Sequence, residues 1–364
     1  MYMSEKSKQI VDACRFCWMC RHICPVGNAT GQERNTSRAR ALGLSLVNRG
    51  AAELTADIMD NIYECQMCEA CTKDCATGWD PTYFTKEVRL QAALDGKTPD
   101  YINDIVDKVL ATGNVYGAKK AKAAAEKAIK NHEKEEKILL FLGDEARYNA
   151  PEAAANAIAV LEKAGVKFTT LAKEPASGAA LDWLIGAAEE TKAQMADCAA
   201  ALAKYKTIIA FDPQDAKAFV REYKEYGLKL GEVVTFTAYV ADLIKDGKLK
   251  VKNTGKAVTF QDPYQLARQL EETEEPRAIV NACADLTEML LNKKDTMWAG
   301  GSIMAIYNPL VSELVAKERW MNAINVGADT IVTASVSEYV ALKKAAPAGK
   351  KVIGIEELVL SALK

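Results

Sequence analysis

The sequence predicts a helical, cysteine-rich N-terminal domain followed by a duplicated α/β domain with mostly parallel sheets. Eight of the ten cysteines fall between residues 14 and 75, in two copies of the pattern C-x-x-C-x-x-C-x-x-x-C. From Lys137 onward, short apolar segments alternate with helical patterns. The two halves of this second region resemble each other, since TIIA at Thr207 and TIVT at Thr330 are offset by 123 residues.

The spacing of the eight cysteines is typical of bacterial ferredoxins, which hold two [4Fe-4S] clusters. Three thiolates two residues apart can wrap one face of a cluster, while the fourth points toward the neighbouring cluster. We therefore expect crossed ligand sets. The first cluster would be held by Cys14, Cys17, Cys20 and Cys75, and the second by Cys65, Cys68, Cys71 and Cys24.

Zinc and disulfide bonds are the alternatives for such a pattern. Zinc sites gather four ligands around a tetrahedral ion, so a third cysteine in register followed by a fourth would be surplus. Disulfides belong to oxidising compartments, and the segment before Cys14 has neither an apolar run nor a small-residue cleavage site. We expect a cytoplasmic protein whose cysteines stay reduced for iron.

Composition excludes several classes of function. The 364 residues carry 47 Lys and Arg against 49 Asp and Glu, so the formal net charge is −2 and no nucleic-acid footprint follows. No run of eighteen apolar residues is present, so no transmembrane segment is expected. Attachment to a membrane through a partner stays open. Glycine-rich dinucleotide fingerprints after a strand are absent as well.

The cysteine-rich domain, residues 1–117, is predicted to be helical. About 40 residues separate Cys24 from Cys65, which is enough for two helices. Residues 36–50 read as a helix capped by Thr36 or Ser37, and residues 51–65 repeat the helical period up to the second motif. A third helix is expected over residues 82–96.

The remaining chain divides into a linker and two α/β repeats. Residues 118–137 are alanine-rich and charged, and we expect a solvated helical linker there. The two repeats are predicted to span residues 138–252 and 253–364. Their expected strands are 138–143, 167–172, 207–212 and 233–238, then 257–262, 296–301, 330–335 and 351–356.

These features resemble a known family. ATGQERNTSRARAL, at residues 29–42, looks like a stretch of the iron–sulfur subunits of glycolate and lactate oxidation complexes. The same layout is found in one of the subunits of anaerobic glycerol-3-phosphate dehydrogenase and in heterodisulfide reductase C/B fusions. The resemblance implies a partner, an FAD-linked oxidase or dehydrogenase subunit acting on a 2-hydroxy acid, a sugar acid or glycerol phosphate. A further carrier such as ferredoxin, electron-transfer flavoprotein or a quinone-linked protein is also implied.

In that family each α/β repeat carries CCG-type elements with further cysteines, which can bind a third centre. Here the repeats are degenerate, because other residues stand at those positions. The CCG-like positions read Ala176-Ser177-Gly178 and Trp298-Ala299-Gly300-Gly301, the C-P-x-C-like positions Asp212-Pro213-Gln214-Asp215 and Ser335-Val336-Ser337-Glu338, and the D-P-C-like position Asp262-Pro263-Tyr264. Since oxygen donors hold iron–sulfur clusters poorly, we expect no cluster in this region.

Other side chains leave weaker hypotheses. The oxygen-bearing replacements, together with Arg268, would lie at strand ends, where a small-molecule or divalent-ion pocket is conceivable but a decayed site is favoured. Cys198 and Cys283 sit in helical patterns and read as buried small hydrophobes. His132 lies in the charged segment, and no pattern around it indicates a function. Positive charge gathers around the cysteines or forms a docking face, through Arg15, Arg21, Arg34, Arg38 and Arg40.

The sequence therefore supports an electron-transfer subunit without a catalytic residue of its own. Its two [4Fe-4S] clusters would relay electrons between a partner flavoprotein and another carrier. The alternative is a thiol or disulfide reductase subunit like the heterodisulfide reductases, which would need ligands at the C-terminal motifs. An interaction scaffold with structural clusters is the third hypothesis.

Overall fold

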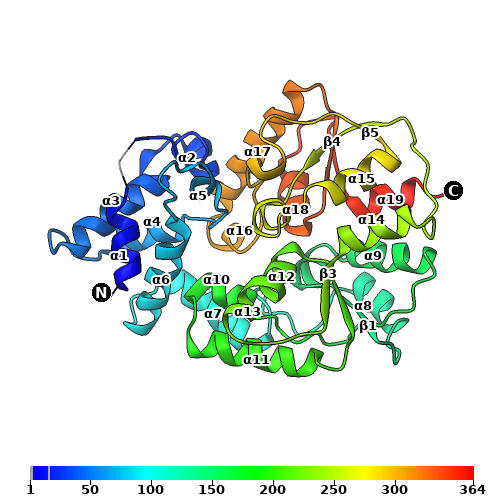
Figure 1. The fold of residues 1–364 in the computed structure, drawn as a ribbon, viewed down its shortest axis with the longest axis horizontal. Coiled ribbons are helices and arrows are strands. Elements are labelled where there is room, and N and C mark those ends of the chain that lie inside the picture. Colours follow the sequence, from blue (N-terminus) through cyan, green and yellow to red (C-terminus); the bar gives the residue numbers. More distant parts are fainter. Residues whose placement is uncertain (1–2, 15–16) are drawn as a thin grey trace.

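A helical domain and an α/β region make up the chain (Figure 1). The computed structural model describes residues 3–14 and 17–364. The helical domain, drawn in blue and cyan, lies at one end of the molecule, and both cysteine motifs belong to it. Its elements are α1 (Glu5–Asp12), α2 (Pro25–Thr30), η1 (Glu33–Asn35), α3 (Ser37–Asn48), α4 (Ala56–Tyr63), α5 (Ala70–Asp74), α6 (Pro81–Leu94) and α7 (Asp100–Thr112).

Local signals explain where these helices begin. The side chain of Thr36 accepts a hydrogen bond from the backbone N–H of Ala39, and Thr55 caps α4 in the same way. Asp80 caps α6, where Pro81 occupies the first turn. The three helices expected between residues 36 and 96 are thus present, with a helical cysteine-rich domain as predicted.

The next segment differs from the expected solvated linker. Helix α8 (Ala123–Lys130) occupies only part of residues 118–137, and it packs against α9 (Pro151–Lys163). Ala125 and Ile129 on its inner face are buried in the core of the α/β region. Two apolar residues four positions apart are enough to pack a short helix against the core. The charged composition of the segment therefore did not indicate that this helix is partly buried.

The first α/β half continues from α8. It comprises β1 (Ile138–Phe141), η2 (Glu145–Asn149), α9, α10 (Ala179–Ile185), α11 (Glu189–Leu202), β2 (Thr207–Ala210), α12 (Pro213–Lys217), η3 (Ala218–Glu222), α13 (Tyr223–Glu225), β3 (Glu232–Thr235) and α14 (Phe236–Lys245).

The second half follows. It comprises β4 (Ala257–Gln261), η4 (Gln265–Gln269), α15 (Glu274–Cys283), β5 (Asp285–Leu286), η5 (Lys293–Asp295), α16 (Met304–Tyr307), α17 (Pro309–Asn325), β6 (Thr330–Thr333), α18 (Val336–Ala345), β7 (Lys351–Gly354) and α19 (Ile355–Ser361).

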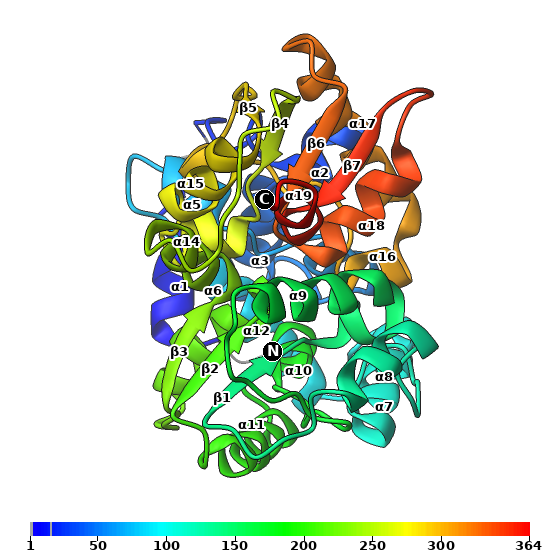
Figure 2. The same ribbon diagram turned by 90° about the vertical axis from the view of Figure 1, so that its right-hand side faces the viewer.

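Both sheets are parallel, as predicted (Figure 2). The first has the order β1-β2-β3 and the second β5-β4-β6-β7. The register aligns Leu140 with Ile209 in the first sheet and Phe260 with Val332 in the second. A single parallel bridge joins Leu139 to Thr169 beside β1. That bridge is all that forms of the strand expected at 167–172.

The prediction of a strand at residues 296–301 is wrong. These residues form an irregular buried segment, and the extra strand next to β4 is β5 instead. Gly300 and Gly301 adopt φ angles of 90° and 83°, which an extended strand does not allow. An added Cβ on Gly301 would lie 2.2 Å from the carbonyl oxygen of Ser337, so the segment approaches α18 too closely for a side chain.

The domains share their hydrophobic cores. Helices α9, α14, α15 and α19 pack together between the two sheets, where Phe211 meets Phe236 edge to face. Trp183 and Leu184 of α10 lie in the same core as Phe84 and Val88 of α6. The helical domain is therefore fixed against the α/β region rather than tethered to it.

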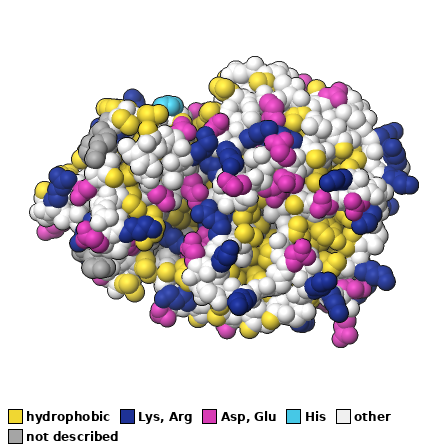
Figure 3. All heavy atoms as spheres, viewed as in Figure 1, with side chains coloured by type: hydrophobic (Ala, Val, Ile, Leu, Met, Phe, Trp, Pro, Cys, Tyr) yellow, Lys and Arg dark blue, Asp and Glu magenta, His cyan; other side chains and the backbone are white. Residues whose placement is uncertain are grey.

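The surface in Figure 3 carries Lys and Arg interspersed with Asp and Glu, and no extended patch of one sign covers this face. This distribution agrees with the near balance of charges in the composition. Within the described residues, no helix is both long and apolar enough to cross a bilayer.

Candidate functional site

The first three cysteines of motif one lie beside the last cysteine of motif two. Cys14, Cys17, Cys20 and Cys75 line one small cavity together with Trp79. Cys17 is exposed to solvent and the other three are half-buried. This cavity therefore opens close to the protein surface.

The last cysteine of motif one lies instead among the cysteines of motif two. The negative charges of the Cys24, Cys65 and Cys68 thiolates all act on Cys71, so these four sulfur atoms share one neighbourhood. Cys68 is buried, and the other three are half-buried. The structure thus brings the eight cysteines together in the two groups that the sequence predicted.

The two motifs share their backbone geometry at two pairs of corresponding described positions. The residue after the second cysteine is left-handed in both, with φ of 74° at Trp18 and 61° at Glu69. The fourth cysteines, Cys24 and Cys75, also share a conformation, with φ/ψ of −75°/113° and −76°/115°. Left-handed residues in such loops turn successive backbone N–H groups toward one centre, a geometry found at many anion and iron–sulfur sites.

The two groups differ in their electrostatics. Burial raises the pKa of Cys24, Cys68 and Cys71 above the usual value, so iron must displace a proton from each of these thiols on binding. Cys75 behaves in the opposite way. Its burial acts to raise the pKa, but hydrogen bonds from Thr77 and Trp79 outweigh it and lower the pKa.

Buried donors around the cysteines show that an anionic group fits here. Arg40 Nη2, Arg89 Nε, Arg268 Nη2 and Trp79 Nε1 are buried and have no hydrogen-bond partner among the described residues. A buried donor without a partner costs about 1–3 kcal/mol, more when charged, so several of them near one set of thiolates favour an anionic occupant. Eight thiolates with such neighbours fit [4Fe-4S] clusters.

Within the described part of the chain, no three His, Cys, Asp or Glu side chains are arranged around a single metal ion. A cubane does not require such a group, because each of its four irons takes one cysteine.

The basic side chains near the motifs have different environments. Arg40 is buried, donates to the carbonyl of Asn61, and has its pKa raised by the Cys65 and Cys24 thiolates although burial acts to lower it. Arg38 pairs with Glu33 and lies 3.8 Å from the centre of the Trp18 ring. Arg21 lies 5.4 Å from the same ring, Arg34 pairs with Glu64, and Arg15 lies outside the described residues.

The comparisons with known proteins agree with this geometry. Residues 10–79 match the family model of the 4Fe-4S dicluster domain. The chain is 24% identical over 362 residues to one of the subunits of dihydromethanophenazine:CoB–CoM heterodisulfide reductase from Methanosarcina acetivorans, covering 89% of this chain and 86% of that protein. It is 27% identical over 141 residues to lactate utilization protein A of Shouchella clausii, covering 38% of this chain and 54% of that protein.

A crystal structure of a hypothetical protein from Helicobacter pylori shares the fold, with a TM-score of 0.58 and 13% sequence identity, covering 99% of this chain and 73% of that one. Residues 10–79 thus match a 4Fe-4S dicluster domain, and the chain is similar to subunits of oxidoreductases. The resemblance predicted from the sequence is confirmed.

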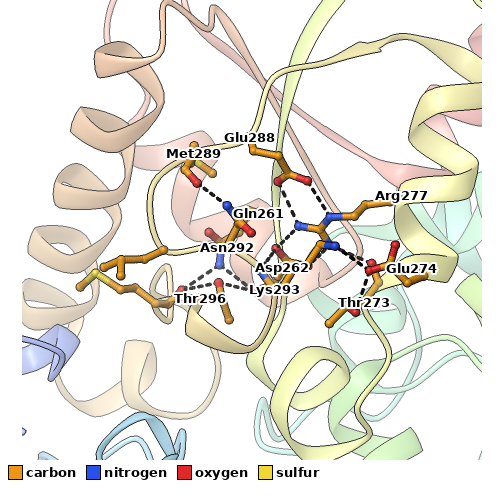
Figure 4. A network of polar contacts seen from close by, with 12 residues as sticks. Gln261, Asp262, Thr273, Glu274, Arg277, Glu288, Met289, Asn292, Lys293 and Thr296 are labelled. Carbon is orange, nitrogen blue, oxygen red and sulfur yellow. Dashed lines mark hydrogen bonds and ion pairs between the residues drawn. The ribbon is translucent and has the colours of Figure 1, made fainter. Parts of the chain in front are cut away.

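The oxygen-bearing residues of the α/β region do not come together in one pocket. Asp262 is held by the guanidinium of Arg277 at 2.7 and 2.9 Å and by the backbone N–H of Lys293 at 2.8 Å (Figure 4). Glu338 accepts from the backbone N–H of Ala299, and burial raises its pKa to about 8. Asp262 is therefore a satisfied structural carboxylate.

Tyr264 and Arg268 face the cysteines rather than a pocket of their own. Gln66 Nε2 donates to the Tyr264 hydroxyl at 3.1 Å, and Arg268 Nε donates to the carbonyl of Cys68 at 2.7 Å. No local sequence pattern signals these contacts, because about 200 residues separate the partners.

Asp212 and Asp215 do line a cavity, of about 230 Å³, in the first half. Asp144, Glu145 and Glu174 contribute further carboxyl groups to its wall. Burial raises the pKa of Asp144 to about 8 and that of Asp212 to about 7. The cavity is therefore lined by carboxyl groups that resist ionisation at neutral pH.

Asp144→Asn is expected to stabilise the protein more at pH 8 than at pH 5. An unfolded aspartate loses its proton at about pH 3.9, whereas folded Asp144 keeps it until about pH 8, so stability falls as the pH rises between these values. Asparagine removes this loss, and we expect a gain of about 1–3 kcal/mol at pH 8. Urea unfolding at both pH values measures it, with Asp57→Asn at an exposed position of α4 as the control. An equal effect at both pH values would contradict the assignment.

The two remaining cysteines are buried in helices, as predicted. Cys198 of α11 and Cys283 of α15 are fully buried, and burial raises their pKa to about 12 and about 11. Such thiols are poor nucleophiles and poor ligands. His132, by contrast, is more than a linker residue, since it stacks on Phe168 and hydrogen-bonds Glu162 at 2.8 Å.

Proposed function

We propose that the chain is the electron-transfer subunit of an oxidoreductase complex, with two [4Fe-4S] clusters in crossed ligation. Cys14, Cys17, Cys20 and Cys75 would hold one cluster, and Cys65, Cys68, Cys71 and Cys24 the other. The observation that carries the proposal is the grouping of Cys75 with motif one and of Cys24 with motif two. When bound, such clusters take up and release single electrons.

The chain's own residues would position and insulate this relay. The cysteines and left-handed loops hold the ligand sets, and the buried arginines balance the negative charge of one of them. Cys17, Trp18 and Met19 are exposed next to the first set, with Trp18 46% and Met19 44% accessible. An exposed apolar rim beside an exposed ligand suits the docking of a redox partner.

The partner would be an FAD-linked oxidase or dehydrogenase subunit, with a ferredoxin, an electron-transfer flavoprotein or a quinone-linked protein as second carrier. Support comes from the similarity to lactate utilization protein A and to the heterodisulfide reductase subunit of Methanosarcina acetivorans. We also propose a cytoplasmic location, because eight thiols reserved for iron require a reducing compartment.

The α/β region is proposed to be a duplication with degenerate CCG-type elements, over residues 138–252 and 253–364, following the cysteine domain at 1–117 and the segment 118–137. Equivalent residues support it. Left-handed Gly178 and Gly301 are 123 residues apart, as are Asp215 and Glu338, and each acid accepts a hydrogen bond from the glycine-containing segment of its own half. The strand orders β1-β2-β3 and β4-β6-β7 also correspond.

A thiol or disulfide reductase subunit is the second candidate, favoured by the similarity to the heterodisulfide reductase subunit over 89% of the chain. Against it, the positions for a third centre carry Ser177, Asp215, Asp262 and Glu338, which are hard donors occupied by hydrogen bonds.

Iron and acid-labile sulfide content of the anaerobically purified chain, with an EPR spectrum after reduction, tests the proposal. We expect about eight of each per chain and signals from two interacting clusters. About twelve irons would move the reductase candidate to the front, and clusters that no reductant or flavoprotein reduces would leave only a structural role.

A further inference from the structure

Three guanidinium groups surround the second set of cysteines, and carbonyl oxygens are their acceptors. Arg40 donates to Asn61, Arg89 to Cys65 and Arg268 to Cys68, each through a backbone carbonyl. Among the described residues, none of the three has a carboxylate oxygen within 4.0 Å. None of the three charges is therefore neutralised in a close ion pair, although the Glu64 carboxylate acts on Arg40 from a longer distance.

Arg268 is the member of this group that comes from the α/β region. It lies in η4, and its Nε donates to the Cys68 carbonyl at 2.7 Å. Nη1 donates to the carbonyls of Thr296 and Lys294, while Nη2 is buried without a partner in the described chain. Three carbonyls from two segments fix the guanidinium against the cysteine loop and leave its Nη2 group to spare.

The loop that Arg268 contacts carries Cys68 and has an unfavourable backbone conformation. Met67 and Glu69, on either side of Cys68, both have positive φ angles, of 53° and 61°. Gln269, the next residue of η4, donates to the Met67 carbonyl at 3.3 Å and to the Glu69 side chain at 3.0 Å. Consecutive residues of η4 thus clamp the segment that carries Cys68.

Among the described residues, Arg38 is the basic side chain that lines the cavity of the first set of cysteines. Arg38 is paired with Glu33 and covers the Trp18 ring, and Arg21 lies beside the same exposed ring. Cys17 is open to solvent, so water and salt screen charges near it. In the described chain, buried arginines without a close ion pair thus gather around the second set.

We propose that Arg268 is a positioning residue that raises the reduction potential of the cluster held by Cys24, Cys65, Cys68 and Cys71, making it the higher of the two. An added electron is an added negative charge, which a fixed cation stabilises most strongly where water is excluded. Burial alone would lower the potential, and the three unpaired guanidinium groups outweigh it. An electron that enters through the cluster at the exposed cysteines would then be transferred to the cluster at the buried cysteines.

This inference rests on the two-cluster function proposed above. Its redox step is a one-electron reduction, in which dithionite supplies the electron during the test and no protein bond forms or breaks. The α/β region thereby acquires a role in electron transfer, because η4 supplies the charge and the clamp.

A redox titration of the full chain, followed by EPR, tests the proposal on wild type, Arg268→Gln, Arg268→Lys and Lys294→Gln. In Arg268→Gln the higher of the two midpoint potentials should fall and the lower should stay. Arg268→Lys, which keeps the charge, should restore most of the shift. Lys294→Gln removes the same charge from an exposed ion pair with Glu271 beside Arg268, and should leave both potentials unchanged.

The proposal is overturned if the lower potential moves instead, if neither moves, or if glutamine and lysine act alike. If Arg268→Gln fails to keep its clusters, Cys75→Ser decides, because the cluster it retains should show the higher wild-type potential and not the lower. A wild type with iron for fewer than two clusters would defeat the proposed function itself, whereas full iron with an unmoved potential defeats only this inference.

Discussion

Cys75→Ser is expected to remove the cluster of the first motif although Cys75 belongs to the second. Cys75 lines the same cavity as Cys14, Cys17 and Cys20, so its loss leaves that set with three thiolates. We expect iron to fall from about eight to about four per chain, since each cubane carries four. Iron analysis and EPR of the reduced, anaerobically purified variant measure the loss.

Cys24→Ser is the reciprocal variant. Cys24 interacts with Cys65, Cys68 and Cys71, so its loss should spare the first set. Cys198→Ser is the matched control, because Cys198 lies buried in α11 away from both sets and should keep full iron. If Cys75→Ser and Cys24→Ser remove the same cluster, or if each destroys the cluster of its own motif, the crossed assignment is wrong.

The grouping of the cysteines is predictable from the sequence because the geometry within each motif is local. Two residues between cysteines set the reach of each loop, and the left-handed residues Trp18 and Glu69 follow from the same repeat. The helices between and after the motifs are also predictable, since Thr36, Thr55 and Asp80 mark their starts. The parallel strands are predictable as well, because short apolar segments alternate with helical patterns from Lys137 onward.

The surroundings of the cysteines were not predictable in this way. Arg268 and Gln269 contact residues about 200 positions away, and no local pattern distinguishes them from surface side chains. The apolar residues at 296–301 predict a strand, but they are buried in an irregular segment that the backbone angles of Gly300 and Gly301 reveal. Burial alone does not separate a strand from such a segment.

Arg89→Met should destabilise the protein strongly, because Arg89 joins the helical domain to the α/β region. The side chain is 0% exposed and donates to the carbonyls of Ile62 and Cys65 in its own domain, and to that of Trp183 in α10 at 2.8 Å. Its guanidinium also lies 4.0 Å from the centre of the Trp183 ring. Methionine fills much of the space, but it removes the charged donor from the carbonyls of Trp183 and Cys65, whereas the carbonyl of Ile62 keeps a backbone donor.

We expect the free energy of unfolding to fall by about 3–5 kcal/mol, from the lost charged hydrogen bonds and the unsatisfied acceptors. Anaerobic urea unfolding followed by tryptophan fluorescence measures this. Arg49→Met is the matched control, since Arg49 is 66% exposed, pairs only at the surface with Asp12, and should cost less than about 1 kcal/mol. Equal costs for the two variants would show that Arg89 does not hold the domains together. A larger cost for Arg89→Met, with loss of iron from the second set alone, would tie the domain contact to the loop that carries Cys65.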